Sequence, residues 1–327
     1  MKILITGSAG FIGWKVAERA LNDGHTVVGV DNLCDSYDVR LKKWRLEQLS
    51  NSDQGHFAFY HADISDLTAL ENIFRKEHGL DAVINLAARA GVRQSVKNPH
   101  IYYATNVTGV LNLLDLCTRY GIGKFVQAST SSLYGVGIEQ PFREDAKTDN
   151  VLSPYAASKK AAEVLCYTYH YLYHLDISVL RYFTVFGPAG RPDMSYFRFI
   201  QWIAEEKPLT VFGDGEQKRD FTFVDDIADG TIRALKPLGY EIINLGSNHP
   251  ISLKHMIELL EDLIGKKARI VHKTEHPADV RSTWADISKA ERLLGWKPRV
   301  NLEDGLAIAV RWYTENRHWT RDIKTNL

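Results

Sequence analysis

Two side chains near the middle of the chain have the types and spacing for proton transfer to a hydroxyl group. Tyr155 and Lys159 lie four residues apart in the stretch SPYAASKK, so a helix would place both on one face. A free phenol with a pKa of about 10 is a poor base at neutral pH, but a nearby ammonium, together with a positively charged bound group, would lower that pKa. The bare pattern is also common on solvated helices, so its meaning depends on what surrounds it.

A second reactive group ends an apolar run. The sequence STSSLYG, residues 129–135, follows the apolar stretch 124–128 and begins with four consecutive hydroxyl side chains and no carboxylate. We expect Thr130 to hydrogen-bond an oxygen that is being oxidised or reduced, which completes a triad with Tyr155 and Lys159. The alternative is that the serines only satisfy backbone groups at the end of a strand.

The first residues carry a glycine pattern suited to a phosphate group. Gly7, Gly10 and Gly13 directly follow an apolar run and open an amphipathic one, so a pyrophosphate could approach the amides of a helix N-terminus. Asp31 ends the next apolar run, where its carboxylate can accept both ribose hydroxyls of NAD and would repel a 2′-phosphate. A solvated strand-end acid is the alternative for Asp31. Asp63 closes a third run and could meet the adenine or cap the following helix.

These residues must be positioned by alternating elements in the first half of the chain. We predict strands at 2–6, 26–30, 57–61, 82–86, 124–128 and 177–181, and helices at 11–22, 67–77, 102–119 and 155–173. Repeated strand and helix is typical of an α/β fold with a parallel, doubly wound sheet of the Rossmann type, which binds ligands at the carboxyl edge. That edge would gather the glycine loop, Asp31 and the hydroxyl run.

The regular alternation of strands and helices changes after residue 183, where loops rich in Gly, Pro and Asp separate shorter elements. We expect a dinucleotide-binding domain at 1–183, to which 222–248 returns, and a smaller α/β substrate domain at 184–327. Asp225 and Asp226 are expected to cap the helix that follows them.

Composition narrows the class of partner. The 327 residues include 40 basic and 40 acidic side chains, so no overall field favours nucleic acid or an acidic membrane, and a small molecule is the expected partner. No apolar stretch is long enough to span a bilayer. Cys34, Cys117 and Cys166 lie far apart, which is typical of free thiols in a reducing compartment, and we expect a cytoplasmic protein. We expect no metal site, because His170 and His174 share a helical face without a third ligand.

The motifs together resemble one family, the extended short-chain dehydrogenase/reductases that act on nucleotide sugars. The resemblance covers nearly the whole chain, through TGSAGFIG, VDNL, ADISD, NLAARAGVRQS, STSSLYG, SPYAASKKAAE, RYFTVFGPAGRPDM, VFGDGEQKRDFTFVDDIADG and WADISKAERLLGW in order. Within the family, AGVRQS, the serine-rich turn and GPAGRPDM are most similar to the UDP-glucuronate 4-epimerases. The resemblance implies tightly bound NAD, catalytic roles for Thr130, Tyr155 and Lys159, and a homodimer packed through the helices at 102–119 and 155–173.

The resemblance also assigns binding residues. It implies cofactor contacts for Gly7, Gly10, Phe11, Ile12, Gly13, Asp31, Asn32, Asp63, Ile64, Leu86, Ala87, Ala88, Tyr155, Lys159, Tyr182 and Val185. For the UDP-sugar it implies contacts from Arg191, Arg219 and Asp279 to the pyrophosphate or ribose, and from Arg93 near the sugar. A solvated loop charge is the alternative for each arginine.

The hydroxyl run then distinguishes between reactions. In the related 4,6-dehydratases and decarboxylating synthases, acidic residues follow the catalytic threonine, whereas this chain has Ser131 and Ser132. Serine at its normal pKa is a poor acid for expelling water, so elimination is disfavoured. We expect Ser131, Ser132 and Thr184 to hold the C6 carboxylate of a UDP-hexuronic acid while C4 is epimerised. The alternatives are a 4-epimerase of neutral hexoses, a dehydratase, or a non-catalytic NAD-binding regulator, which would generally have lost the Tyr or the Lys.

Overall fold

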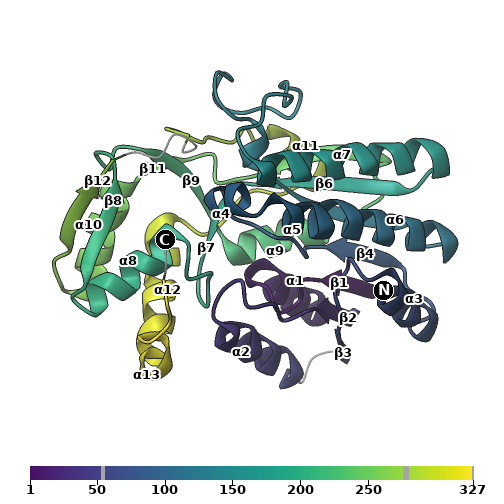
Figure 1. The fold of residues 1–327 in the computed structure, drawn as a ribbon, viewed down its shortest axis with the longest axis horizontal. Coiled ribbons are helices and arrows are strands. Elements are labelled where there is room, and N and C mark those ends of the chain that lie inside the picture. The colour runs from purple at the N-terminus through teal and green to yellow at the C-terminus, as the bar shows by residue number, and fades with distance from the viewer. Residues whose placement is uncertain (53–55, 275–279, 326–327) are drawn as a thin grey trace.

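The largest layer of the molecule is a seven-stranded parallel sheet (Figure 1). The computed structural model describes residues 1–52, 56–274 and 280–325. The strands lie in the order β10 (Tyr240–Leu245), β6 (Asp176–Tyr182), β5 (Lys124–Thr130), β4 (Ala82–Asn85), β1 (Lys2–Thr6), β2 (Thr26–Asp31) and β3 (His56–His61). Strand order reverses between β1 and β4, and doubly wound sheets bind ligands at such a switch point. The predicted α/β fold is confirmed.

Helices cover both faces of this sheet because successive strand residues point to opposite sides. In β1, Ile3 and Ile5 belong to one buried apolar cluster and Leu4 belongs to the other. The first cluster includes side chains of α1 (Phe11–Asn22), α2 (Val39–Ser50), α9 (Val224–Arg233) and α11 (Ser288–Leu294). The second includes side chains of α3 (Leu67–Lys76), α6 (Gly109–Arg119) and α7 (Pro154–Tyr173).

The predicted strands and helices of the first half are present with ends shifted by at most two residues, with one exception. The predicted helix at 102–119 is wrong as a single element. It consists of α5 (Pro99–Tyr103), a π-helical turn (Ala104–Thr108) and α6. The turn directs Asn106 inward, where its amide nitrogen donates to the Arg89 carbonyl and the Ser158 hydroxyl, both at 2.9 Å. Such turns are frequent beside functional sites.

The chain after residue 183 builds smaller sheets at one end of the large one (Figure 1). Besides α9, β10 and α11, its elements are β7 (Thr184–Phe186), α8 (Ser195–Ala204), β8 (Pro208–Phe212), β9 (Lys218–Phe223), β11 (Pro250–Ser252), α10 (Leu253–Ile264), β12 (Arg269–Lys273), α12 (Leu302–Glu315) and α13 (Arg317–Thr320). Strands β11, β9 and β7 form one sheet, and β12 and β8 form another. The predicted domain limits stay a prediction, since one buried apolar cluster joins residues from both parts.

The expectation that Asp225 and Asp226 cap α9 is wrong. Phe223 is the N-cap of this helix, and Asp225 and Asp226 lie within its first turn. Asp226 accepts a hydrogen bond from the Val300 amide at 3.0 Å, and Asp225 pairs with Lys15 at 3.3 Å. Both carboxylates therefore connect α9 to neighbouring segments and leave the cap position to Phe223. None of the described helices is both long and apolar enough to cross a membrane.

Candidate active site

The glycine loop between β1 and α1 leaves room for an anion because side chains are excluded there. Gly7 has φ +68°, and a Cβ on it would lie 2.7 Å from the Ala87 amide nitrogen. A Cβ on Gly13 would lie 2.0 Å from the Gly7 carbonyl oxygen. The N-cap of α1 is Gly10, which has no side chain to occupy the first-turn amides. The loop therefore fits the pyrophosphate of a dinucleotide.

The predicted adenosine-side residues lie together at the ends of β2 and β3. The Asp31 carboxylate is buried and accepts from the amides of Ala9 at 3.2 Å and Leu33 at 2.8 Å. The Asn32 amide group donates to Asp63 at 2.6 Å. Although burial raises the pKa of Asp63, hydrogen bonds from Ser65 and Asn32 bring it below its usual value. Asp63 does not cap the next helix, since Asp66 does.

The other predicted cofactor residues lie at the carboxyl ends of strands of the large sheet or in the segments that follow these strands. Phe11 and Ile12 begin α1, while Ile64, Leu86, Ala87 and Ala88 follow β3 and β4. Tyr182 ends β6, and its hydroxyl forms a 2.8 Å hydrogen bond with Thr231 of α9. Val185 is buried within β7. Because the Tyr182 hydroxyl already has a buried partner, only the other atoms of this residue suit a ligand contact.

Thr130 and Tyr155 meet at the end of β5. Thr130 accepts from the Ser132 amide and donates to the Ser132 hydroxyl, both at 3.2 Å. Burial raises the pKa of Tyr155, whereas a hydrogen bond with Thr130 and the charge of Arg191 lower it by a smaller amount. The expectation that Lys159 lowers this pKa together with a nicotinamide ring stays a prediction. Arg191 is the cation that acts on the phenol, and the expectation missed it because Arg191 lies on a different segment.

Lys159 lies one helical turn beyond Tyr155 and is 3% exposed. Burial lowers the pKa of its ammonium to about 8, against a smaller opposite effect of Cys166 and Glu163. Glu163 accepts a 2.6 Å hydrogen bond from Ser129 and a two-pronged ion pair from Arg181 at 3.0 and 2.8 Å. This buried network fixes α7 against β5 and β6, and so positions Tyr155 beside Thr130.

Four of the predicted substrate residues line one cavity of about 200 Å³. Ser131, Ser132, Thr184 and Arg219 meet there, although the turn after β5, strand β7 and strand β9 supply them from distant parts of the sequence. The other lining residues are Val92, Gly135, Phe142, Leu152, Ser153, Val280 and Thr283. Among the described residues, no carboxylate lines this cavity. It can therefore accept an anionic group through hydroxyls and a guanidinium.

The remaining predicted substrate residues lie elsewhere. Arg191 forms an ion pair with Asp193 at 2.6 Å, which raises the pKa of Arg191 despite the opposing effect of burial. The guanidinium carbon of Arg93 on α4 (Val92–Lys97) lies 4.2 Å from the ring centre of Phe212. The Arg93 side chain therefore contacts the last residue of β8. Asp279 lies outside the described residues. His170 and His174 take part in no metal-binding cluster among the residues that the structure describes.

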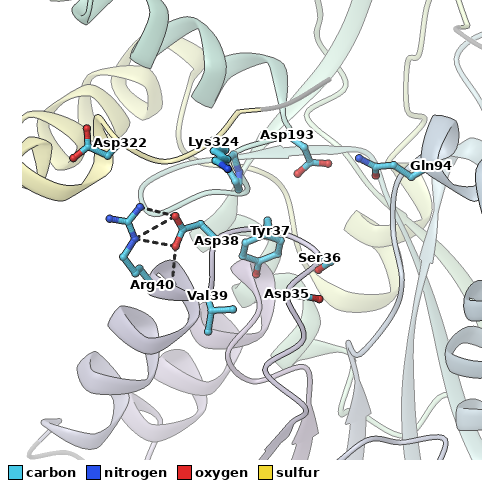
Figure 2. Close-up of a pocket in the computed structure, with 11 residues that line it drawn as sticks. Asp35, Ser36, Tyr37, Asp38, Val39, Arg40, Gln94, Asp193, Asp322 and Lys324 are labelled. Atoms are coloured by element: carbon cyan, nitrogen blue, oxygen red, sulfur yellow. Dashed lines mark hydrogen bonds and ion pairs between the residues drawn. The ribbon is translucent and has the colours of Figure 1, made fainter.

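A larger cavity of about 430 Å³ lies beside Asp193 (Figure 2). The loop after β2 contributes Asp35, Ser36 and Tyr37 to its wall, and the last described residues contribute Asp322 and Lys324. Figure 2 shows Asp38 held by Arg40 at its rim, with a 2.6 Å contact. Sequence reasoning predicted none of these lining residues.

Other residues missed from the sequence are buried polar groups whose partners are remote in sequence. Asn106, Glu163 and Arg181 brace the catalytic helix. Lys42 pairs with Asp31 at 3.2 Å, and this charge raises the pKa of Lys42 although burial lowers it. Lys42 lies on α2, a helix that was not predicted from the sequence, so no sequence signal indicated it.

The chain is similar to known proteins over nearly its full length. The model of the NAD dependent epimerase/dehydratase family matches residues 3–246. A UDP-glucuronate 4-epimerase of Thermodesulfobacterium geofontis is 59% identical over 322 residues, which cover 98% of this chain and 98% of that protein.

Two solved structures extend the similarity to three dimensions. The UDP-glucuronic acid 4-epimerase of Bacillus cereus, crystallised with UDP-glucuronic acid and NAD, has a TM-score of 0.89 at 38% identity, covering 97% of this chain and 100% of that chain. The UDP-glucose 4-epimerase of Thermotoga maritima with UDP-glucose has a TM-score of 0.87 at 31% identity, with 97% and 100% covered.

Proposed function

Because the chain belongs to the NAD dependent epimerase/dehydratase family, we propose that it inverts C4 of UDP-glucuronate to give UDP-galacturonate. The observation that carries this proposal is the cavity in which Ser131, Ser132 and Thr184 meet Arg219 beside Thr130. A uronate differs from a neutral hexose by one carboxylate, which the hydroxyl donors Ser131, Ser132 and Thr184 bind well.

The catalytic triad exchanges the proton of the C4 hydroxyl. NAD bound at the glycine loop and Asp31 would supply the hydride acceptor for the C4 hydrogen and the donor for its return to the opposite face of the sugar. Tyr155 removes the hydroxyl proton as the hydride leaves and gives it back on return, so there is no net redox change. Thr130 orients the phenol through their hydrogen bond. Lys159, with a pKa of about 8, is mostly charged at neutral pH and stabilises the phenolate form of Tyr155 that accepts this proton.

The hydroxyls around the cavity have a second task. A 4-keto uronate is a β-keto acid, which loses carbon dioxide when its carboxylate bond aligns with the carbonyl system. Ser131, Ser132 and Thr184 hold the carboxylate away from that alignment. For the nucleotide end we propose Arg191, Arg219 and Asp279, and for the sugar Arg93.

We propose the sequence-predicted cofactor residues at the ends of β1 to β4 and on α7 as the NAD site, on the support of the glycine loop and the buried Asp31. We also propose a homodimer packed through α6 and α7, and a cytoplasmic location. Exposed apolar side chains on α7 support the dimer, and Cys34, Cys117 and Cys166, none of them in a disulfide, support a reducing compartment.

The test is incubation of purified protein with UDP-glucuronate and no added NAD, followed by chromatography. We expect UDP-galacturonate and little decarboxylated UDP-pentose. The similarity to the Thermotoga maritima enzyme keeps a neutral-hexose 4-epimerase as the second candidate. Faster turnover of UDP-glucose than of UDP-glucuronate under the same conditions would favour that candidate and contradict the proposal.

A further inference from the structure

Arg45 on α2 is a fully buried arginine whose five N–H groups all donate to neutral oxygens. It is 0% exposed. One terminal nitrogen donates to the Ala9 carbonyl at 3.0 Å and to the Tyr37 hydroxyl at 2.7 Å. The other two nitrogens donate to the Ala189 carbonyl at 3.0 and 2.6 Å, and one of them also to the Gly190 carbonyl at 3.2 Å. All donors of the planar guanidinium are therefore used.

These hydrogen bonds join the two loops that face the proposed ligands. Ala9 lies inside the glycine loop, and its amide donates to Asp31. Ala189 and Gly190 directly precede Arg191, whose charge acts on Tyr155. Since Arg45 is 36 residues from Ala9 and 144 from Ala189, the connection exists only in the folded protein. It forms a bridge between the cofactor side and the substrate side of the site.

The loop before Arg191 depends on this bridge because its backbone is held in an unfavourable conformation. Ala189 has φ +50°, in the left-handed region that non-glycine residues rarely adopt. A Cβ on Gly190 would lie 1.6 Å from the Tyr196 hydroxyl oxygen, so the loop passes close to α8. Residues in such conformations persist only when their surroundings hold them. The two bonds from Arg45 to the Ala189 carbonyl are such a restraint.

The charge of Arg45 is also informative. Within the described part of the chain, Arg45 takes part in no ion pair with a carboxylate, and its acceptors are three carbonyls and a phenol. A buried charge without an opposite charge is costly. The glycine loop that Arg45 contacts is the part of the chain that fits a pyrophosphate, so a bound dinucleotide would bring negative charge to the same loop.

We infer that Arg45 is a positioning residue that couples the cofactor site to the nucleotide-sugar site, by fixing the loop of Arg191 to the glycine loop. This inference rests on the proposed function. Lysine would keep the charge but not the bridge, because a single ammonium cannot reproduce the fork that spans both loops. Charge and bridging are therefore separable by substitution.

The experiment measures release of NAD from the purified holoprotein, with and without saturating UDP as the probe of the substrate site. The variants are Arg45→Lys and Arg45→Met. Leu41→Ala is the matched control, because Leu41 is also 0% exposed on α2 and contributes no hydrogen bond to either loop. In the wild type we expect UDP to slow NAD release about 10-fold or more, within the range typical of coupled sites.

We expect Leu41→Ala to keep that ratio, and both Arg45 variants to reduce it to within about 2-fold of unity. Arg45→Lys should retain NAD better than Arg45→Met. Equal ratios in Leu41→Ala and Arg45→Lys, or no effect of UDP on the wild type, would overturn the inference. A wild-type protein that carries no NAD and shows no epimerisation would instead contradict the proposed function, so the two failures are distinguishable.

Discussion

The buried ammonium of Lys159 lowers the stability of the folded protein, whereas the proposed reaction needs its charge. Its pKa falls from an ordinary value of 10.5 to about 8 in the folded protein. Below pH 8 the ammonium is charged in both the folded and the unfolded states, so the full cost of burying the charge opposes folding. Between pH 8 and 10.5 only the unfolded state holds the proton, so the stability contribution of this group improves as pH rises.

We therefore predict that Lys159→Met stabilises the protein while it inactivates it. At pH 7 the free energy of unfolding should increase by about 3 kcal/mol, the equivalent of the pKa shift, and kcat should fall at least about 100-fold. Denaturant unfolding at several pH values measures the first effect, which should shrink between pH 8 and 10.5. Lys160→Met is the control, since Lys160 is only partly buried and bonds to Thr148 at 2.6 Å. A destabilised Lys159→Met would contradict the argument.

The serines of the cavity should determine the preference for a uronate. Replacing Ser131 and Ser132 by alanine removes two hydroxyls from the cavity wall while Thr130 and Tyr155 remain. We expect kcat/KM on UDP-glucuronate to fall about 10- to 100-fold, kcat/KM on UDP-glucose to change less than about 3-fold, and the share of decarboxylated product to rise. Steady-state rates with both sugars check this. Unchanged turnover of UDP-glucuronate would favour serines that only satisfy backbone groups.

At the scale of elements, the turn from β1 into α1 requires glycine at a specific place. A Cβ on Gly13 would lie 2.0 Å from the Gly7 carbonyl oxygen. The Gly7 backbone could move away from that Cβ only if the glycine loop shifted with it. We predict that Gly13→Ala purifies without NAD and loses about 2 kcal/mol or more of stability. Gly123→Ala is the control, because nothing lies within 4 Å of a Cβ there. Absorbance of the released cofactor and thermal unfolding provide the measurements, and a Gly13→Ala protein that retains NAD would argue against the assigned loop.

The elements that the sequence pattern predicted are those whose apolar residues follow a regular period. Strands such as β1 and helices such as α1 were predicted residue for residue, because burial on a sheet face enforces that period. The helix at 102–119 could not be predicted correctly, since the π-helical turn around Asn106 depends on a hydrogen bond to Ser158 across the fold. For the same reason, the roles of Arg45 and Arg181 could not be predicted, because their hydrogen-bond partners lie far away in the sequence. Thr130, Tyr155 and the glycine loop were predictable because their chemistry is local to a motif.

At the scale of the whole molecule, α7 carries several exposed apolar side chains. Val164 and Tyr171 are 55% and 69% exposed and lie two helical turns apart, which places them on one side of the helix. We predict a dimer in solution that Val164→Glu combined with Tyr171→Glu converts to a monomer, as measured by sedimentation or light scattering. Ile308→Glu on α12, at an exposed apolar position elsewhere, should leave the dimer intact. A wild-type monomer at micromolar concentration would contradict the proposed dimer.

The fate of one hydrogen atom tests the central claim most directly. Purified enzyme without added NAD is given UDP-glucuronate that carries deuterium at C4, and the product is examined by mass spectrometry and NMR. If the hydride leaves C4 and returns to the same carbon, UDP-galacturonate keeps the deuterium at C4 with no net reduced cofactor. Loss of the label to solvent, or its accumulation in reduced cofactor while a keto sugar is released, would contradict the account.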